Sequence, residues 1–489
     1  MSAMHEQRVD TVRRNLARRD LEQMLVCDPR SIQYLTGAYV EPGERFLGLV
    51  ITPDAEPTLV LNALFTAPDD AACAVRAFTD TDDPLALVEE LCNADAPLGC
   101  DKNLPARFLL PLMERGAAAG FVLASDAVDD ARAHKDAAEQ DFMRAASATN
   151  DAAMGRFRQL VHEGVTEADV AGQLEGIYRE LGAQGHSFTP IVSFGANAAD
   201  PHHEPDDTPL APGDVVLFDV GCRQDEYCSD MTRTFVFGEP TPKQREVHDT
   251  VRRANEAARA LVAPGVRFCD IDAAARNVID EAGYGPYFTH RLGHQIGLDV
   301  HEPGDVSSAH DAPVEAGMIF SIEPGIYLPG EFGVRIEDLV LVTEDGCECS
   351  TATRAKSTPS DNAFRPRTRA ACLRKRASLV RSSAYLPPKR PDSFPRMSPS
   401  PKKSPTTSIT LFMLSSLPSR SGSTAATTSL SSSSLSSRPV AFLMAAPGSM
   451  PKFLSCSGSS AAPLTNCPTI SCTSIFLLLT ARLPASTIR

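Results

Sequence analysis

Hydrophobic positions repeat with two different periods over the first 125 residues. Short runs of aliphatic and β-branched residues predict strands, and stretches with helical spacing lie between them. The predicted strands are Met24–Cys27, Phe46–Ile51, Pro57–Leu61 and Gly120–Ala124, and the predicted helices are the segment ending at Arg19 and Pro84–Ala94. Such alternation is typical of an α/β domain, which we place at residues 1–130. The Asp- and Ala-rich stretch Asp126–Asp136 marks its boundary.

The second part of the chain, residues 138–350, combines long helices with strands. Helical spacing predicts Ala138–Leu160, Glu167–Leu181, Pro242–Val262 and Cys269–Ala282. Runs of β-branched and aromatic residues predict strands at Asp214–Val220, Thr232–Phe237, Gly317–Ile322 and Val334–Val342. Helices on one side and antiparallel strands on the other are typical of an α+β layer fold.

Residues 351–489 have a different composition. They include 30 serines and many prolines, and they show no sustained period. A segment of this kind cannot bury enough apolar surface to offset the entropy lost on ordering. We interpret it as a disordered tail produced by a frameshift or run-on translation, with a genuine disordered interaction tail as the alternative.

The charge changes sign at the same boundary. Residues 1–350 hold 28 Lys and Arg against 60 Asp and Glu, whereas residues 351–489 hold 19 against 2. The acidic excess is spread along the first part, which has only three lysines. This pattern resembles a salt-adapted protein, because concentrated salt screens the self-repulsion of a highly charged chain. Nucleic acid and anionic membranes are therefore not expected as partners of residues 1–350.

The sequence favours a cytoplasmic protein. Residues 1–25 have no apolar signal-peptide core, and apolar runs such as Ile475–Leu479 are far shorter than the ~20 residues of a membrane span. The nine cysteines before residue 351 include no CxxC pair, which favours a reducing compartment.

Five ionisable residues lie in apolar or glycine-rich surroundings in the second domain. Asp219, for example, interrupts the apolar strand Val215–Val220, where a charge must be paired or bound to a metal ion. The others are Asp230, His294, Glu323 and Glu337. Each of them alone is more often a hydrogen-bonded structural residue. Four carboxylates and one imidazole together form a hard, oxygen-rich set that suits Mn²⁺, Co²⁺ or Zn²⁺.

The motifs around these residues resemble those of a known family. In chain order they are Asp219-Val220-Gly221, Ser229-Asp230-Met231-Thr232-Arg233-Thr234, Val300-His301-Glu302 and Ile322-Glu323-Pro324-Gly325. Residues 140–345 resemble the pita-bread metallopeptidases, which include methionine aminopeptidase, aminopeptidase P and prolidase. Residues 5–125 resemble the creatinase/prolidase N-terminal domain. Several motifs in order are much more specific than any single one.

The resemblance implies a role for each candidate residue. Asp219 would bind one metal ion, His294 and Glu323 would bind the other, and Asp230 and Glu337 would bridge both. Mn²⁺ is the metal that the resemblance favours, with Co²⁺ and Zn²⁺ as alternatives.

Three further residues match family positions near the substrate. His202 and His301 would contact the scissile bond, and Glu323 would also shuttle a proton. Arg335 would orient the site or the substrate. The simpler alternatives are a solvated loop for His202, a packed core histidine for His301 and an ordinary salt bridge for Arg335.

The implied activity is cleavage of an Xaa-Pro bond by a hydroxide that bridges two metal ions. The N-terminal domain favours aminopeptidase P or prolidase over methionine aminopeptidase, and the resemblance implies a homodimer. Preference for dipeptides or for longer peptides stays open. A metal-free creatinase-like C–N hydrolase and a non-catalytic pita-bread binding protein are the alternatives, but both would be expected to lack the ligands that are present here.

We expect the thermal stability of this protein to rise as KCl increases from about 0.1 M to beyond about 1 M. The reason is the net charge of −32 over residues 1–350. Salt continues to screen this overall repulsion at concentrations where the screening of ordinary surface ion pairs has already saturated. Thermal melts followed by circular dichroism test this, with sucrose at equal osmolality as the non-ionic control. A flat or falling curve in KCl would count against salt adaptation.

Overall fold

Capping residues determine where the longest helices begin. The computed structural model describes residues 3–350 and 363–364. Asp136 and Thr241 form capping boxes with Glu139 and Gln244, three positions further on. They start helices α6 (Ala137–Phe157) and α8 (Pro242–Leu261), both within one residue of the predicted starts.

The N-terminal domain is built on a six-stranded mixed sheet in the order β4-β3-β2-β1-β5-β6. Its strands are β1 (Gln23–Val26), β2 (Leu47–Ile51), β3 (Thr58–Asn62), β4 (Ala74–Phe78), β5 (Pro97–Cys100) and β6 (Gly120–Leu123). Its helices are α1 (Ala3–Ala17), α2 (Pro29–Thr36), α3 (Pro84–Leu91) and α4 (Ala106–Arg115). All four predicted strands are present, and the α/β prediction is confirmed, although α2, α4, β4 and β5 were not predicted.

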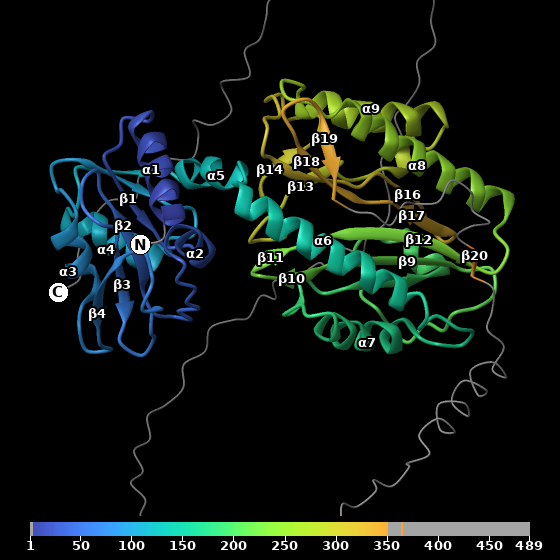
Figure 1. Ribbon diagram of the computed structural model, residues 1–489, viewed down its shortest axis with the longest axis horizontal. Helices are drawn as coiled ribbons and strands as arrows, with labels where there is room; N and C mark the ends of the chain where they lie inside the picture. Colours follow the sequence, from blue (N-terminus) through green and yellow to red (C-terminus); the bar gives the residue numbers. More distant parts are fainter. Residues whose placement is uncertain (1–2, 351–362, 365–489) are drawn as a thin grey trace, which may run out of the picture. The chain divides into compact units, whose positions relative to one another are not determined.

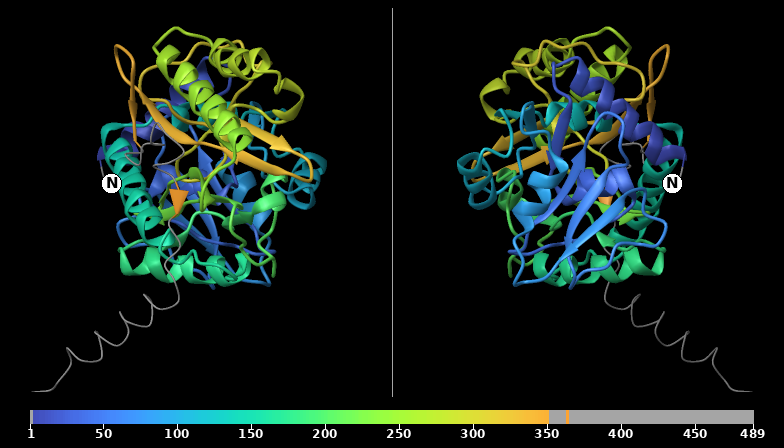
Figure 2. Two further views of the ribbon diagram at one scale, coloured as in Figure 1. Left: turned by 90° about the vertical axis from the view of Figure 1, so that its right-hand side faces the viewer. Right: turned by 90° about the vertical axis from the view of Figure 1, so that its left-hand side faces the viewer.

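In the second domain, strands lie between two pairs of helices (Figures 1 and 2). One pair is α6 and α7 (Glu167–Glu180), and the other is α8 and α9 (Phe268–Glu281). The larger sheets have the orders β20-β12-β9-β8 and β14-β13-β15-β18-β19. Their strands are β8 (Ile191–Phe194), β9 (Val215–Val220), β12 (Met231–Phe237), β13 (Gly293–Gln295), β14 (Glu302–Val306), β15 (Ile319–Ile322), β18 (Asp338–Val342) and β19 (Cys347–Cys349). This arrangement confirms the α+β prediction.

Shorter elements complete the second domain. The strands β7 (Gly185–His186), β10 (Cys222–Gln224) and β11 (Tyr227–Cys228) form one small sheet, and β16 (Gly325–Leu328) and β17 (Phe332–Arg335) form another. Two 3₁₀ helices are η1 (Gly195–Ala199) and η2 (Gly285–Tyr287).

Two segments differ from the prediction. The single strand predicted at Val334–Val342 is divided into β17 and β18, because the chain turns at Glu337, whose backbone N–H donates to the Thr232 carbonyl (3.1 Å). The boundary stretch after Ser125 forms helix α5 (Asp126–Ala133), whose small buried residues pack in the same core as α1. A stripe of alanine is a weak periodic signal, so the sequence pattern did not show this helix.

The prediction that residues 351–489 are disordered falls on residues that the structure does not describe, apart from residues 363–364. Ala363–Phe364 forms β20, which pairs in parallel with Val236–Phe237 of β12.

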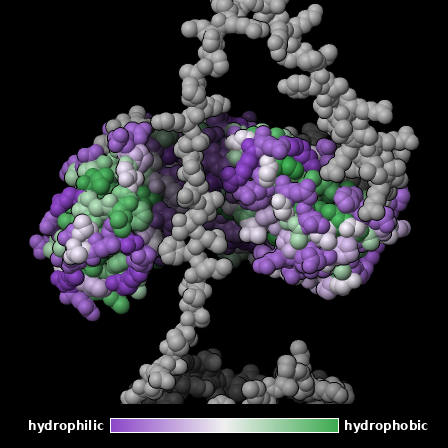
Figure 3. Space-filling view, turned by 90° about the horizontal axis from the view of Figure 1, so that it is seen from below, coloured by the Kyte–Doolittle hydropathy of each residue, from purple (hydrophilic) through white to green (hydrophobic). Residues whose placement is uncertain are grey.

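Figure 3 shows small hydrophobic patches among mainly hydrophilic side chains on one face of the molecule. Several of the large exposed hydrophobic side chains belong to the N-terminal domain, including Leu110 and Met113 of α4 and Val122 and Leu123 of β6. Within the part of the chain that the structure describes, no helix is long and apolar enough to cross a membrane.

A buried ion cluster joins the end of α5 and the residues that follow it to β14. The Glu302 carboxylate accepts hydrogen bonds from Arg132 (2.7 Å) and Lys135 (3.0 Å), and all three side chains are at most 5% exposed. Burial raises the pKa of Glu302, but the charges of Lys135 and Arg132 outweigh it and lower the pKa to about 2. The ionised form of Glu302 is therefore the one that stabilises the fold.

We expect Glu302→Gln to lower the free energy of unfolding by about 3–5 kcal/mol at pH 7, because it leaves the buried Lys135 without its anion and leaves Arg132 only its pairs with Asp299 and Asp28. The folded pKa of Glu302 lies below its ordinary value of 4.5, so this stabilisation is complete above that pH and is lost as the pH falls toward about 2. Urea unfolding at several pH values measures both effects.

The matched control is Glu315→Gln, which removes the exposed partner of His134 near the same segment. It should cost less than about 1 kcal/mol. Equal losses of unfolding free energy in the two variants would contradict the assignment. So would a stability difference between wild type and Glu302→Gln that does not become smaller below pH 4.5.

Candidate metal centre

Paired strands bring the first two candidate ligands together. Asp219 lies on β9 opposite Thr232 of β12, and Asp230 immediately precedes β12. Both aspartates are at most 9% exposed. The side-chain hydroxyl of Thr232 donates to Glu337 Oε2 (2.8 Å), so Glu337, which immediately precedes β18, lies close to the same strand pair.

His294 approaches these carboxylates from β13. The pairing of β13 with β14 shifts register after His294, and such a bulge re-aims the adjoining side chains. His294 Nε2 lies 3.7 Å from Asp230 Oδ2 and 3.6 Å from Glu323 Oε1. Ligand atoms of Asp230, His294 and Glu337 all lie within 4.8 Å of one another. The structure thus brings these predicted ligands together.

Hydrogen bonds leave one imidazole nitrogen available to a metal ion. His294 Nδ1 lies 3.1 Å from the Gln295 carbonyl, so this nitrogen donates its proton there and Nε2 faces the carboxylates with its lone pair. Burial, followed by the charge of His301, lowers the pKa of His294 to about 3. His294 is therefore neutral at pH 7, the form that binds metals.

Three carboxylate oxygens in this site have no hydrogen-bond partner although they are buried: Asp219 Oδ1, Asp230 Oδ1 and Glu337 Oε1. Burying an unpaired carboxylate is costly, so these oxygens need cations. Burial and then the charges of neighbouring carboxylates raise the pKa values of Asp230 and Glu337 well above the ordinary range. Divalent metal ions would remove this repulsion, and the donor set fits them.

Arg335 links the site to a hydrogen-bonded network that sequence reasoning did not identify. Its Nη2 donates to Asp219 Oδ2 (2.5 Å), its Nε to Thr232 Oγ1 (3.1 Å) and its Nη1 to Tyr327 Oη (2.8 Å). Arg335 therefore orients Asp219 and leaves the other oxygen of that carboxylate, Oδ1, for a metal ion.

The network continues to His290. Because Arg335 donates to Tyr327 Oη, the tyrosine hydroxyl donates its own proton to His290 Nε2 (2.8 Å), and His290 Nδ1 donates to the Arg291 carbonyl (2.7 Å). Burial lowers the pKa of His290 to about 4, which keeps it neutral in this chain. The sequence offered one indication of this role, since His290 lies four residues before the predicted ligand His294.

The two predicted substrate histidines lie beside the metal ligands. The rings of His301 and His294 meet edge to face with centroids 4.2 Å apart. His202 is exposed, and its charge would lower the pKa values of both His290 and His301, so it lies near them. The structure therefore places both histidines at the edge of the candidate centre, where a substrate could contact them.

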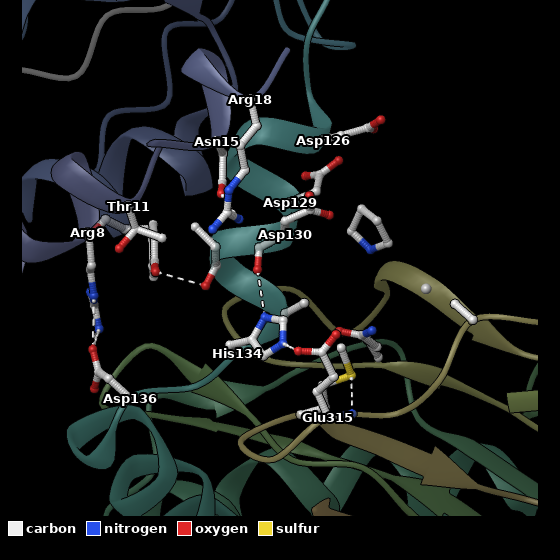
Figure 4. Close-up of a pocket in the computed structure, with 18 of the residues that line it drawn as sticks. Arg8, Thr11, Asn15, Arg18, Asp126, Asp129, Asp130, His134, Asp136 and Glu315 are labelled. Atoms are coloured by element: carbon white, nitrogen blue, oxygen red, sulfur yellow. Dashed lines mark hydrogen bonds and ion pairs between the residues drawn. The ribbon is translucent and has the colours of Figure 1, made fainter. Parts of the chain in front are cut away.

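Figure 4 shows another cavity, of about 700 Å³. It is lined by side chains of α1 and α5, such as Asn15 and Asp129, and by residues near β15 such as Met318. Its lining includes two ion pairs, Arg8–Asp136 and His134–Glu315, and none of the predicted site residues. The orphaned carboxylate oxygens, rather than this cavity, mark the candidate centre.

Two family models match this chain, one in each of its two domains. Residues 141–344 match the model of metallopeptidase family M24, and residues 8–134 match that of the creatinase/prolidase N-terminal domain. A putative dipeptidase, YkvY, of Bacillus subtilis is 37% identical over 329 residues, which cover 66% of this chain and 91% of that protein.

Two solved structures share the fold. Dipeptidase PepE from Mycobacterium ulcerans is 36% identical with a TM-score of 0.68, and the match covers 72% of this chain and 96% of that one. The prolidase from Pyrococcus horikoshii OT3 is 31% identical with a TM-score of 0.67, covering 72% and 99%. These matches confirm the predicted pita-bread catalytic domain with its smaller N-terminal domain. The chain therefore belongs to metallopeptidase family M24, and it is a metallopeptidase that acts on peptides.

Proposed function

We propose that this metallopeptidase uses two divalent metal ions to cleave the Xaa-Pro bond of dipeptides. The observation that carries the proposal is the set of three buried carboxylate oxygens without partners, on Asp219, Asp230 and Glu337. Two of these carboxylates, Asp230 and Glu337, have ligand atoms within 4.8 Å of the neutral imidazole of His294. A purely structural cluster would have its acceptors satisfied by hydrogen-bond donors.

The ligand assignment follows the resemblance to the pita-bread metallopeptidases. In this proposal Asp219 would hold one ion, His294 and Glu323 would hold the other, and Asp230 and Glu337 would hold both. When bound, two such ions supply Lewis-acid polarisation of the scissile carbonyl and a hydroxide nucleophile at neutral pH.

The side chains around the metal ligands perform the remaining steps. Glu323 has the most exposed side chain of the four carboxylates, 16% against 13% for Asp219, so it can exchange protons with substrate. It takes the proton of the attacking water and passes it to the departing proline nitrogen. His202 and His301 donate hydrogen bonds to the carbonyl oxygen as it gains negative charge.

The relatives favour a dipeptide substrate. The protein from Bacillus subtilis is named a putative dipeptidase, and the two structures are a dipeptidase and a prolidase. We extend this to the present chain and place Xaa-Pro dipeptides ahead of longer peptides. Mn²⁺ is the proposed metal, because carboxylate-rich ligand sets suit it.

We also propose a salt-adapted cytoplasmic homodimer. The acidic composition of residues 1–350 supports salt adaptation. None of the nine described cysteines forms a disulfide, which fits a reducing compartment. The exposed hydrophobic side chains of α4 and β6 offer a surface for a second copy.

The alternatives have less support from the site. A metal-free creatinase-like hydrolase would not need the three orphaned oxygens, and a non-catalytic binding protein would not need an intact ligand set. Metal analysis by mass spectrometry together with a peptidase assay separates the three, since about two metal equivalents with turnover are expected only of the peptidase.

We expect Asp219→Asn and His294→Ala to abolish turnover and to lose at least one metal ion, because each removes a direct ligand. Metal content by mass spectrometry and hydrolysis of an Xaa-Pro dipeptide would be measured on the same samples. Near-normal turnover with full metal content in either variant would show that the ligand assignment is wrong.

His301→Ala is the matched contrast to His294→Ala, since the two rings are in contact. It should lower kcat by about 10²–10³-fold, the usual effect of removing one donor to a developing oxyanion, and should keep both metal ions. Loss of metal from this variant would instead place His301 among the ligands.

We expect an Xaa-Pro dipeptide to be hydrolysed faster than an Xaa-Pro-Yaa tripeptide in high salt with added Mn²⁺. The measurement is kcat/KM for both peptides, with Xaa-Ala dipeptides as the control for proline. A faster tripeptide would indicate an aminopeptidase, and equal rates for the proline and alanine dipeptides would contradict Xaa-Pro specificity.

A further inference from the structure

A second buried acid, Glu167, lies outside the metal centre and takes no part in the mechanism above. It is the first residue of α7, and its side chain is completely buried. Its carboxylate accepts four hydrogen bonds. Oε1 accepts from the Phe194 backbone N–H (2.6 Å) and from Asn197 Nδ2 (3.1 Å), and Oε2 accepts from His203 Nε2 (2.7 Å) and the Asp206 backbone N–H (3.1 Å).

All four donors belong to one continuous segment, residues 194–208, which contains η1 and the loop with His202. The backbone of α7 adds two contacts to the same segment, from the N–H groups of Glu167 and Ala168 to the carbonyls of Thr208 and Asp206. One charged side chain and one helix end thus hold both ends of this segment.

The segment reaches the metal centre at two points. The Pro201 carbonyl lies 3.5 Å from Arg335 Nη1, and Arg335 orients Asp219. At Gly333, two residues before Arg335, an added Cβ would lie 1.8 Å from the Ala198 carbonyl, so η1 packs directly against β17. His202 follows Pro201, which contacts Arg335, and precedes His203, which donates to Glu167. Its charge would lower the pKa values of His290 and His301, so it lies near both.

Glu167, His203 and Asp206 also have the spacing of a metal site, with ligand atoms within 4.8 Å of one another. Their hydrogen bonds favour a different role. Both oxygens of Glu167 already accept two hydrogen bonds each, and His203 presents an N–H rather than a lone pair to this carboxylate. The cluster is therefore built to hold donors in place.

We propose that Glu167 is a positioning residue of the peptidase site, which fixes segment 194–208 and thereby holds His202 against the substrate. This inference rests on the proposed function, because His202 acts on the substrate only if the peptidase assignment is correct. Glu167 itself touches neither the substrate nor a metal ion, and it acts through His202.

A double-mutant cycle of Glu167→Gln and His202→Ala tests the proposal with an Xaa-Pro dipeptide and Mn²⁺. Glu167→Gln replaces one acceptor oxygen by an N–H₂ donor, which must face either the donors of Phe194 and Asn197 or those of His203 and Asp206. This substitution should therefore lower kcat/KM by about 10–100-fold. The double variant should be no slower than His202→Ala alone, because the positioned side chain is already absent. Losses that multiply, or a wild-type rate for Glu167→Gln, overturn the proposal.

Asp169→Asn is the matched control, since Asp169 is an exposed carboxylate in the same first turn of α7. It should leave kcat/KM unchanged. Hydrogen exchange supplies a readout that does not depend on activity: the Phe194 and Asp206 amides should exchange faster in Glu167→Gln and not in Asp169→Asn. Unchanged exchange at both amides would overturn the proposal.

Metal content distinguishes a failure of this inference from a failure of the proposed function. All of these variants should keep the wild-type metal content, whereas a wild-type protein without metal or Xaa-Pro turnover would refute the function itself. If Glu167→Gln prevents folding, His203→Ala and His203→Gln replace it, because glutamine restores an N–H donor to Oε2 and alanine does not. Equal rates for these two variants would overturn the proposal.

Discussion

Repulsion between buried carboxylates is the constraint on which the rest of this structure depends. Asp219, Asp230 and Glu337 meet in a space almost closed to water, and each keeps an oxygen without a protein donor. Protein donors could have satisfied these oxygens, as they do in most interiors. The surrounding residues instead fix the other oxygens of Asp219 and Glu337, through Arg335 and Thr232, and leave these three oxygens without a partner.

The supporting residues lie on strands that are distant in sequence. Thr232 connects Arg335 to Glu337, while Tyr327 and His290 hold Arg335 from its other side. Every proton in this chain of hydrogen bonds has one direction, because arginine can only donate. The metal centre is thus held in place by a network with no alternative arrangement of its donors, which suits a site that must keep its geometry through repeated turnover.

Patterns in the sequence were sufficient for the features that depend on local signals. Helical spacing located the starts of α6 and α8 to within one residue, and the ordered motifs indicated five candidate ligands, of which the structure brings Asp230, His294, Glu323 and Glu337 close together. Features that depend on tertiary contacts were not predictable. The break at Glu337 follows from a hydrogen bond to Thr232, and the role of Glu167 follows from donors up to 39 residues away.

The ion cluster of Glu302 has a consequence for the exchange of domains between related proteins. Arg132 and Lys135 follow the N-terminal sheet in sequence, yet their shared anion belongs to β14 of the catalytic domain. A recombination point after Lys135 would separate two buried cations from a buried anion, whereas a point before Arg132 would transfer all three together. A domain boundary that keeps this ion cluster intact therefore lies inside α5, upstream of α6, the first helix of the catalytic domain.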